Sequence, residues 1–246
     1  MAEFVYPPVI RTALGLFRAL GLKLDVQGAE HVPETGGAVL ASTHVSYLDF
    51  IFVGLGAHPK RLVRFMAKKQ VFDHPVSGPL MRGMHHIPVD RKAGAAAYDE
   101  ALRALKEGEL IGVFPEATIN RAFDVKTLKT GAARLALESG TPLIPVAIWG
   151  TQRIWTKGRP RNFRKRGVPV TIVVGEPIPV APGDDLVQVT ERLHDRLRVM
   201  LTHAQDTYPD APEGPDDAWW LPARLGGTAP TVEESRRMDA EDFENR

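Results

Sequence analysis

Short apolar runs of strand length recur along the chain from residue 22 onward, and segments with helical periodicity or loops separate them. Strands buried in a parallel sheet read as nearly continuous apolar runs, and their alternation with helices is typical of α/β domains. Seven runs have this character: LKLDV, GAVLA, LVRFM, HIPV, LIGVF, PLIPVAI and VTIVV. The pattern predicts an α/β fold with a twisted, mostly parallel sheet of about seven strands flanked by helices.

Apolar residues at helical spacing over residues 10–20 predict an amphipathic helix near the start of the chain. Arg11 and Arg18 lie on its opposite side. This helix either packs on the core or lies in a membrane interface with its arginines toward anionic headgroups, and the two interpretations are compatible.

Three further helices are predicted over residues 95–106, 131–138 and 184–203, the last with one apolar stripe that we interpret as core packing. After about Gln205 the composition changes, because the last 42 residues hold 11 acidic and 4 basic side chains. Trp219 and Trp220 are expected to dock this segment onto the body.

These patterns divide the chain into an N-terminal helix (1–21), a central domain (22–204) and an acidic, proline-containing tail (205–246). A chain of 246 residues with 43% hydrophobic residues supports one sizeable core. The formal net charge of +1 is too balanced for a general nucleic-acid binder. We therefore expect no nucleic-acid partner.

The chain has no cysteine, which excludes disulfides, thiolate metal sites and a cysteine acyl-enzyme. No apolar run approaches the roughly 18 residues that a membrane-spanning helix needs, and the N-terminus lacks a signal-peptide pattern. We expect neither secretion nor a transmembrane anchor.

The stretch STHVSYLDF places His44 and Asp49 between a predicted strand and a predicted helix. The turn after a strand is where α/β folds usually build their sites. A helix beginning near Ser46 would put Asp49 in its first turn, where the carboxylate can orient and stabilise the imidazole. The alternative is structural, since an acidic residue also favours a helix N-terminus.

The sequence contains neither a GxSxG serine elbow nor an HExxH metal motif. A histidine and aspartate pair without a nucleophile close in sequence suggests that the base activates a hydroxyl of the substrate. We expect no metal ion at this site.

Three more stretches follow in a fixed order: AKKQVFDHPVSGPLMRGMHHIPVDR (67–91), GVFPEATINR (112–121) and LKTGAARLALESGTPLIPVAIWG (128–150). Together with THVSYLD they resemble, over roughly residues 25–180, the glycerolipid acyltransferase family that includes 1-acylglycerol-3-phosphate acyltransferases. The resemblance implies that His44 takes the proton of a glycerol hydroxyl attacking an acyl-CoA or acyl carrier protein thioester, and that Asp49 supports His44. It implies no cofactor besides this acyl donor.

The resemblance also implies substrate-binding residues. Arg91 matches the family's second motif, in which an arginine binds the acceptor phosphate, and Lys69 in the same block is expected to assist. Glu116 and Thr118 carry over from the third motif, with Glu116 shaping the acceptor site near His44. Opposite Arg91, we expect His44 at one end of a surface groove.

Lys129 and the fourth motif, PLIPVAI, are expected to line the acyl-chain and donor side or to give structural support. Two positions of the third motif depart from the family pattern: Ala117 replaces a glycine, and Ile119 replaces an arginine that contacts phosphate. Either Arg121, or Arg91 with the lysines, supplies the missing charge, or the acceptor headgroup differs. Thr43 replaces the asparagine that commonly precedes the histidine.

Residues 153–166 contain seven basic residues and no acidic ones, with Trp155 and Phe163 interleaved. This segment is either a solvated loop or a contact with anionic lipid or donor phosphates. We hypothesise an enzyme held peripherally on the cytoplasmic face of the cell membrane, with an acyl donor and a lysophospholipid acceptor as substrates. The alternatives are another acceptor, such as glycerol 3-phosphate, or a non-catalytic lipid-binding module; the oligomeric state stays open.

Overall fold

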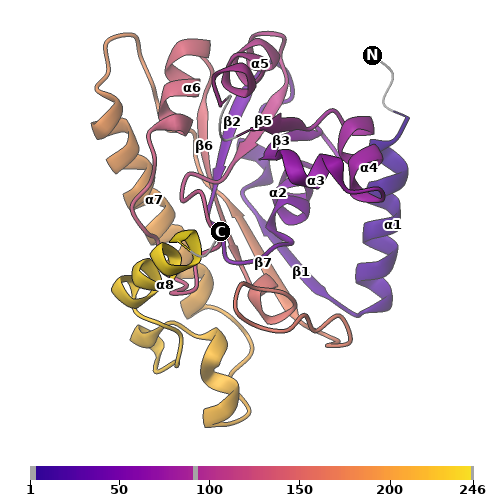
Figure 1. Ribbon diagram of the computed structural model, residues 1–246, viewed down its shortest axis with the longest axis vertical. Coiled ribbons are helices and arrows are strands. Elements are labelled where there is room, and N and C mark those ends of the chain that lie inside the picture. Colours follow the sequence, from indigo (N-terminus) through magenta and orange to yellow (C-terminus); the bar gives the residue numbers. More distant parts are fainter. Residues whose placement is uncertain (1–3, 91–93, 245–246) are drawn as a thin grey trace.

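One seven-stranded sheet forms the centre of the molecule, as seen in a computed structural model that describes residues 4–90 and 94–244 (Figure 1). The strands are β1 (Lys23–Gln27), β2 (Ala38–Ser42), β3 (Val63–Lys68), β4 (Ile87–Val89), β5 (Leu110–Val113), β6 (Leu143–Trp149) and β7 (Pro169–Val174). Their order is β1-β7-β6-β2-β5-β3-β4, and only the β6–β7 pair is antiparallel. The predicted α/β fold with seven strands is confirmed.

Helices cover both faces of this sheet (Figure 1). They are α1 (Tyr6–Ala19), α2 (Asp49–Ala57), α3 (Lys69–Asp73), α4 (Ser77–Gly83), α5 (Gly94–Lys106), α6 (Gly131–Ser139), α7 (Leu186–Asp206) and α8 (Val232–Glu244). One apolar core joins the sheet to α5, α6 and α7, and a second joins it to α1 and α2. The four helices expected from the apolar pattern are present; α3, α4 and α8 were not predicted.

The N-terminal helix α1 packs on the second core. The ring of Phe17 stacks on Phe52 of α2 with ring centroids 5.0 Å apart, and the Tyr6 hydroxyl donates to the Val63 carbonyl at 2.7 Å. Leu16 on the same helix is exposed. Core packing of α1 is therefore observed. None of the helices in the described ranges is long and apolar enough to cross a bilayer.

The segment after α7 lies against the body of the protein. Trp220, in a short 3-10 helix over Pro215–Trp220, is fully buried, and Trp219 is half-buried. The guanidinium of Arg153 lies 4.3 Å from the ring centroid of Trp220 and donates to Asp210 at 2.5 Å. Further along, α8 returns the chain to the loops that follow β5 and β6, where Asp239 pairs with Lys126 and Lys157.

The strand order also decides where a site can form. Because β2 and β5 are parallel neighbours, the segments that follow them leave the same edge of the sheet. His44 follows β2 and Glu116 follows β5. His44 and Glu116, 72 positions apart in the sequence, therefore meet at the carboxyl ends of two central strands of the sheet. This end of the sheet is the edge referred to below.

Candidate active site

The His44–Asp49 pair forms the centre of this edge. The helix α2 begins at Asp49, three residues later than the expected start near Ser46. Asp49 lies in the first turn of this helix, as expected. The His44 imidazole Nδ1 lies 3.0 Å from Asp49 Oδ2. A carboxylate can only accept here, which assigns the Nδ1 proton to the histidine and leaves Nε2 as the basic nitrogen.

Four donors hold the Asp49 carboxylate. Besides the imidazole, Oδ2 accepts the backbone N–H groups of Val45 and Ser46, each at 2.7 Å. The Thr151 hydroxyl donates to Oδ1 at 2.7 Å from the loop after β6. Asp49 is fully buried, whereas the His44 side chain remains 19% exposed. The carboxylate is thus fixed in place behind an imidazole that solvent can reach.

The ring of Phe114 sets the orientation of the imidazole. Its centroid lies 4.0 Å from that of His44, and the two rings are nearly parallel. With Asp49 at one ring nitrogen and Phe114 against one ring face, rotation of the imidazole is restricted. An oriented base of this kind is what proton abstraction from a bound hydroxyl requires.

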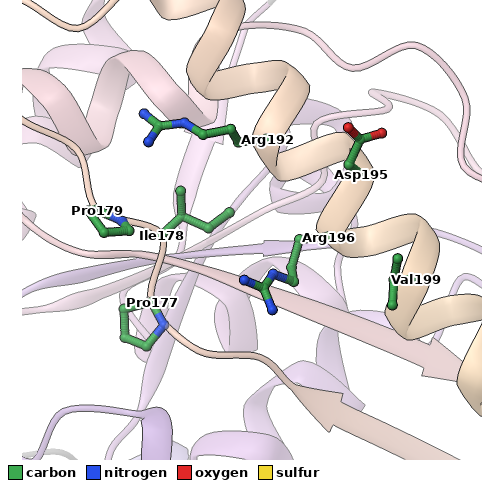
Figure 2. Close-up of a pocket in the computed structure, with 7 residues that line it drawn as sticks. All are labelled: Pro177, Ile178, Pro179, Arg192, Asp195, Arg196 and Val199. Atoms are coloured by element: carbon green, nitrogen blue, oxygen red, sulfur yellow. The ribbon is translucent and has the colours of Figure 1, made fainter.

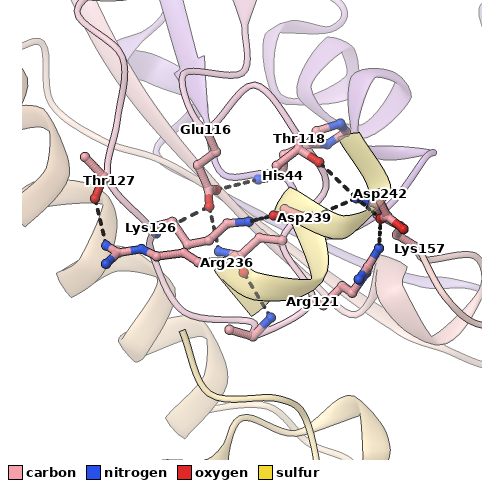
Figure 3. Close-up of polar contacts among 12 residues, drawn as sticks. His44, Glu116, Thr118, Arg121, Lys126, Thr127, Lys157, Arg236, Asp239 and Asp242 are labelled. Atoms are coloured by element: carbon pink, nitrogen blue, oxygen red, sulfur yellow. Dashed lines mark hydrogen bonds and ion pairs between the residues drawn. The ribbon is translucent and has the colours of Figure 1, made fainter. Parts of the chain in front are cut away.

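Glu116 braces the backbone around His44 (Figure 3). Its Oε1 accepts the His44 N–H at 3.1 Å, and its Oε2 accepts from the Asn120 amide at 2.6 Å and from the Lys126 N–H at 3.4 Å. Burial raises the pKa of the Glu116 carboxyl to about 7, although these hydrogen bonds oppose the shift. Glu116 connects the turn that carries His44 to the loop after β5.

Ala117 and Thr43, two of the three positions that depart from the family motifs, can be described from their local structure. Ala117, where the family has glycine, adopts a left-handed backbone with φ of 59°, a conformation in which glycine is less strained. The Thr43 hydroxyl accepts the backbone N–H of Ile148 at 3.1 Å and thereby joins β2 to β6. The third departure, Ile119, is buried and brings no charge to the site.

The other expected binding residues differ in their surroundings. Arg91 lies outside the described residues. Lys69 is 57% exposed and lies 3.8 Å from Asp90, and the Lys129 side chain is exposed while its backbone N–H donates to the Pro115 carbonyl. Thr118 is within 3.4 Å of the Lys157 ammonium. The structure brings His44, Asp49 and Glu116 together and places Thr118 beside a basic group.

Three contributors were missed by sequence reasoning. Thr151 follows the fourth motif without any signal of its own, and Lys126 lies in an unremarked loop. Lys157 belongs to the basic run 153–166, which pointed to anions but not to this position. Only the fold shows that these side chains reach the same edge of the sheet.

An open pocket elsewhere on the molecule is separate from this edge. Pro177, Ile178 and Pro179 line it on one side and residues of α7 on the other (Figure 2). Ile178 bridges to Leu143, the first residue of β6, whereas His44 follows the last residue of the parallel strand β2. The pocket therefore lies toward the opposite end of the sheet from the His44–Asp49 pair.

Comparison with known proteins bears on this geometry. A sequence profile described as Acyltransferase matches residues 23–149, more than half of the chain. The chain belongs to the acyltransferase family. The resemblance carried by the four ordered motifs is confirmed. The expectation that the protein is an enzyme is confirmed as well.

Individual relatives agree. A Bacillus subtilis protein named 1-acyl-sn-glycerol-3-phosphate acyltransferase is 31% identical over 196 residues, covering 76% of this chain and 92% of that protein. A protein of the same name from Limnanthes douglasii is 37% identical over 162 residues, covering 64% of this chain and 55% of that protein.

One solved structure shares the fold. The crystal structure of the 1-acyl-sn-glycerophosphate acyltransferase PlsC from Thermotoga maritima aligns with a TM-score of 0.69 at 22% sequence identity. The alignment covers 83% of this chain and 81% of that chain. It supports the architecture of the acyltransferase.

Proposed function

We propose that this acyltransferase esterifies the free hydroxyl of 1-acylglycerol 3-phosphate with a fatty acyl group from acyl-CoA or acyl carrier protein, producing phosphatidate. The observation that carries the proposal is the buried, four-donor Asp49 carboxylate behind a partly exposed His44 imidazole. Relatives named 1-acyl-sn-glycerol-3-phosphate acyltransferase support the choice of acceptor.

His44 acts as the general base in this reaction. Its Nε2 takes the hydroxyl proton while the acceptor oxygen attacks the thioester carbonyl and forms the new C–O bond. Asp49 stabilises the imidazolium that results. When the C–S bond breaks, the imidazolium returns its proton to the leaving thiolate, which departs as a thiol.

We further propose that the enzyme works peripherally on an anionic membrane, on its cytoplasmic face. Aromatic side chains close to His44 support this proposal. The exposed ring of Tyr47 and the ring of Trp155 have centroids 4.6 Å apart. The centroid of the Trp155 ring is in turn 5.6 Å from that of the exposed Phe163 ring. The guanidinium of Arg161, from the basic 153–166 segment, lies 5.7 Å from the centroid of the Trp155 ring. Aromatic rings with basic neighbours suit the headgroup region of an anionic bilayer, where a lysophospholipid acceptor would lie.

The experiment that tests the activity is thiol release from palmitoyl-CoA on anionic liposomes. Wild type is compared with His44→Ala and with His203→Ala, a control at an exposed position of α7. Each protein receives 1-acylglycerol 3-phosphate, glycerol 3-phosphate or no acceptor, and acyl carrier protein thioester replaces the CoA donor in a parallel series.

We expect release that needs 1-acylglycerol 3-phosphate, persists in His203→Ala and disappears in His44→Ala. Preference for glycerol 3-phosphate would instead identify glycerol 3-phosphate as the acceptor. This outcome is tested because buried Ile119 replaces the family arginine that contacts phosphate. Equal, acceptor-dependent release by wild type and His44→Ala would refute the role of His44. Absence of acceptor-dependent release by wild type with every donor would refute catalysis and favour a lipid-binding module.

A further inference from the structure

Three basic side chains lie close together beside the turn that carries His44 (Figure 3). Arg121 and Lys126 come from the loop after β5, and Lys157 comes from the loop after β6. Their side chains are only 9%, 6% and 13% exposed. Buried cations are costly unless a counter-charge accompanies them, so such a cluster requires an anionic partner.

In this structure the partner is the C-terminal helix α8. Asp239 lies 2.6 Å from the Lys126 ammonium and 2.7 Å from that of Lys157. Asp242 lies 2.8 Å from the Lys157 ammonium and pairs with the Arg121 guanidinium. Two carboxylates from one helix thus occupy the position that an anionic ligand of the cluster would take.

The occupation is incomplete. The buried Arg121 Nε has no hydrogen-bond acceptor among the described residues, although the side chain is more than nine-tenths buried. A phosphate monoester carries nearly two negative charges and three terminal oxygens, so it can accept from a guanidinium and two ammonium groups together.

Polar contacts hold α8 in place. Of its residues Val232–Glu244 only Ser235 is buried, and Phe243 is exposed. The Arg236 guanidinium donates to the Thr127 hydroxyl at 2.8 Å, beside the two aspartates. Because little apolar surface is buried under this helix, its attachment depends on charge and can be exchanged for another anion.

Two short routes connect the cluster to His44. Glu116 accepts from the His44 N–H with one oxygen and from the Lys126 N–H with the other. Lys157 reaches the hydroxyl of Thr118, two residues after Glu116 in the same motif. The cluster is therefore one residue away from the backbone of His44, and it supplies positive charge that Ile119 lacks.

We propose that Arg121, Lys126 and Lys157 form the binding site for the phosphate monoester of the acceptor, and that Asp239 and Asp242 of α8 occupy this site until the acceptor displaces them. The inference rests on the proposed function for the identity of the acceptor. The helix then acts as an internal competitor, so the free enzyme binds acceptor with an affinity reduced by the fraction of molecules in the docked state.

The test is the Asp239→Asn/Asp242→Asn variant of the full chain, with Glu233→Gln/Glu244→Gln as control. The control removes two charges from exposed positions of the same helix. If α8 is docked in about nine tenths of the molecules, we expect the KM for 1-acylglycerol 3-phosphate to fall about tenfold in the aspartate variant and not in the control. Adding Lys126→Met and Lys157→Met to the aspartate variant should raise KM again.

A second readout needs no turnover. Inorganic phosphate should raise the Tm of the aspartate variant more than that of wild type or the control, because the ligand binds only the folded state. If the double variant does not fold, Asp242→Asn alone, which leaves Asp239 between the two lysines, should show the same shifts at smaller size.

The two proposals fail differently. A KM and a phosphate response equal to those of the control, in a variant that turns over, would overturn the inference and leave the proposed function intact. A phosphate-dependent rise in Tm without turnover of any acceptor would refute the proposed function and support the anion site.

Discussion

The Asp49→Asn substitution gives the sharpest test of the proposed role of the His44–Asp49 pair, because it removes the charge of the carboxylate and keeps its shape. Oδ2 accepts from three donors, and Oδ1 accepts only from the Thr151 hydroxyl. The asparagine oxygen can take the three-donor position while its amide donates to Thr151, whose hydroxyl also accepts. We therefore expect a folded variant with a loss of about 2 kcal/mol in the free energy of unfolding.

The kinetic effect follows from the geometry of the pair. At a nitrogen-to-oxygen distance of 3.0 Å the centres of charge of an imidazolium and a carboxylate lie about 4 Å apart. At an effective dielectric constant of about 20 their attraction is about 4 kcal/mol. The attraction exists only once His44 has taken the proton, so its loss raises the activation barrier and should lower kcat about a thousandfold.

The assay is thiol release with saturating acceptor for wild type, Asp49→Asn, His44→Ala and the double variant. If the two residues act as a unit, the double variant should be no slower than His44→Ala. Circular dichroism and Tm confirm that each protein is folded. A folded Asp49→Asn enzyme within about threefold of wild type would refute the role of the charge.

Three further predictions concern pH, stability and membrane binding. Burial raises the pKa of Glu116 to about 7. Between about pH 5 and 7 the folded protein therefore keeps a proton on this carboxyl that the unfolded chain no longer carries. The contribution of Glu116 to stability falls as the pH rises through this range. Urea unfolding should therefore show wild type losing stability relative to Glu116→Gln across this range, and a constant difference would contradict the shift. Trp220→Ala should cost about 3 to 5 kcal/mol in the free energy of unfolding, since the ring is fully buried, and a cost under about 1 kcal/mol would show that the tail contributes little. Phe163→Ala/Arg164→Gln should weaken sedimentation with anionic liposomes by about tenfold, whereas the exposed Arg103→Gln control should not, and equal binding by all three would refute the proposed membrane contact.

Local patterns were sufficient for most of the fold. Each strand overlaps one of the seven runs read from the sequence, although β1 (KLDVQ) is mostly exposed. The helices α1, α5, α6 and α7 each carry a periodic apolar face, so the existence of these elements follows from neighbouring residues. Their ends were less predictable, as at α2, which begins at Asp49 because Ser46 and its neighbours form the turn that donates to the carboxylate. The helix α8 has almost no buried face, and so its sequence gave no apolar period to detect.

The sequence by itself determined the residues on which the proposed chemistry rests: a histidine and an aspartate five positions apart, the ordered motifs around them, and the departure at Ile119. Tertiary structure decided what surrounds that chemistry. Thr151 donates to Asp49 across 102 residues, and Lys126 pairs with Asp239 across 113. Such contacts depend on strand order and on how a polar helix folds back over the sheet edge. No local pattern encodes either, because the paired groups become neighbours only when the sheet assembles.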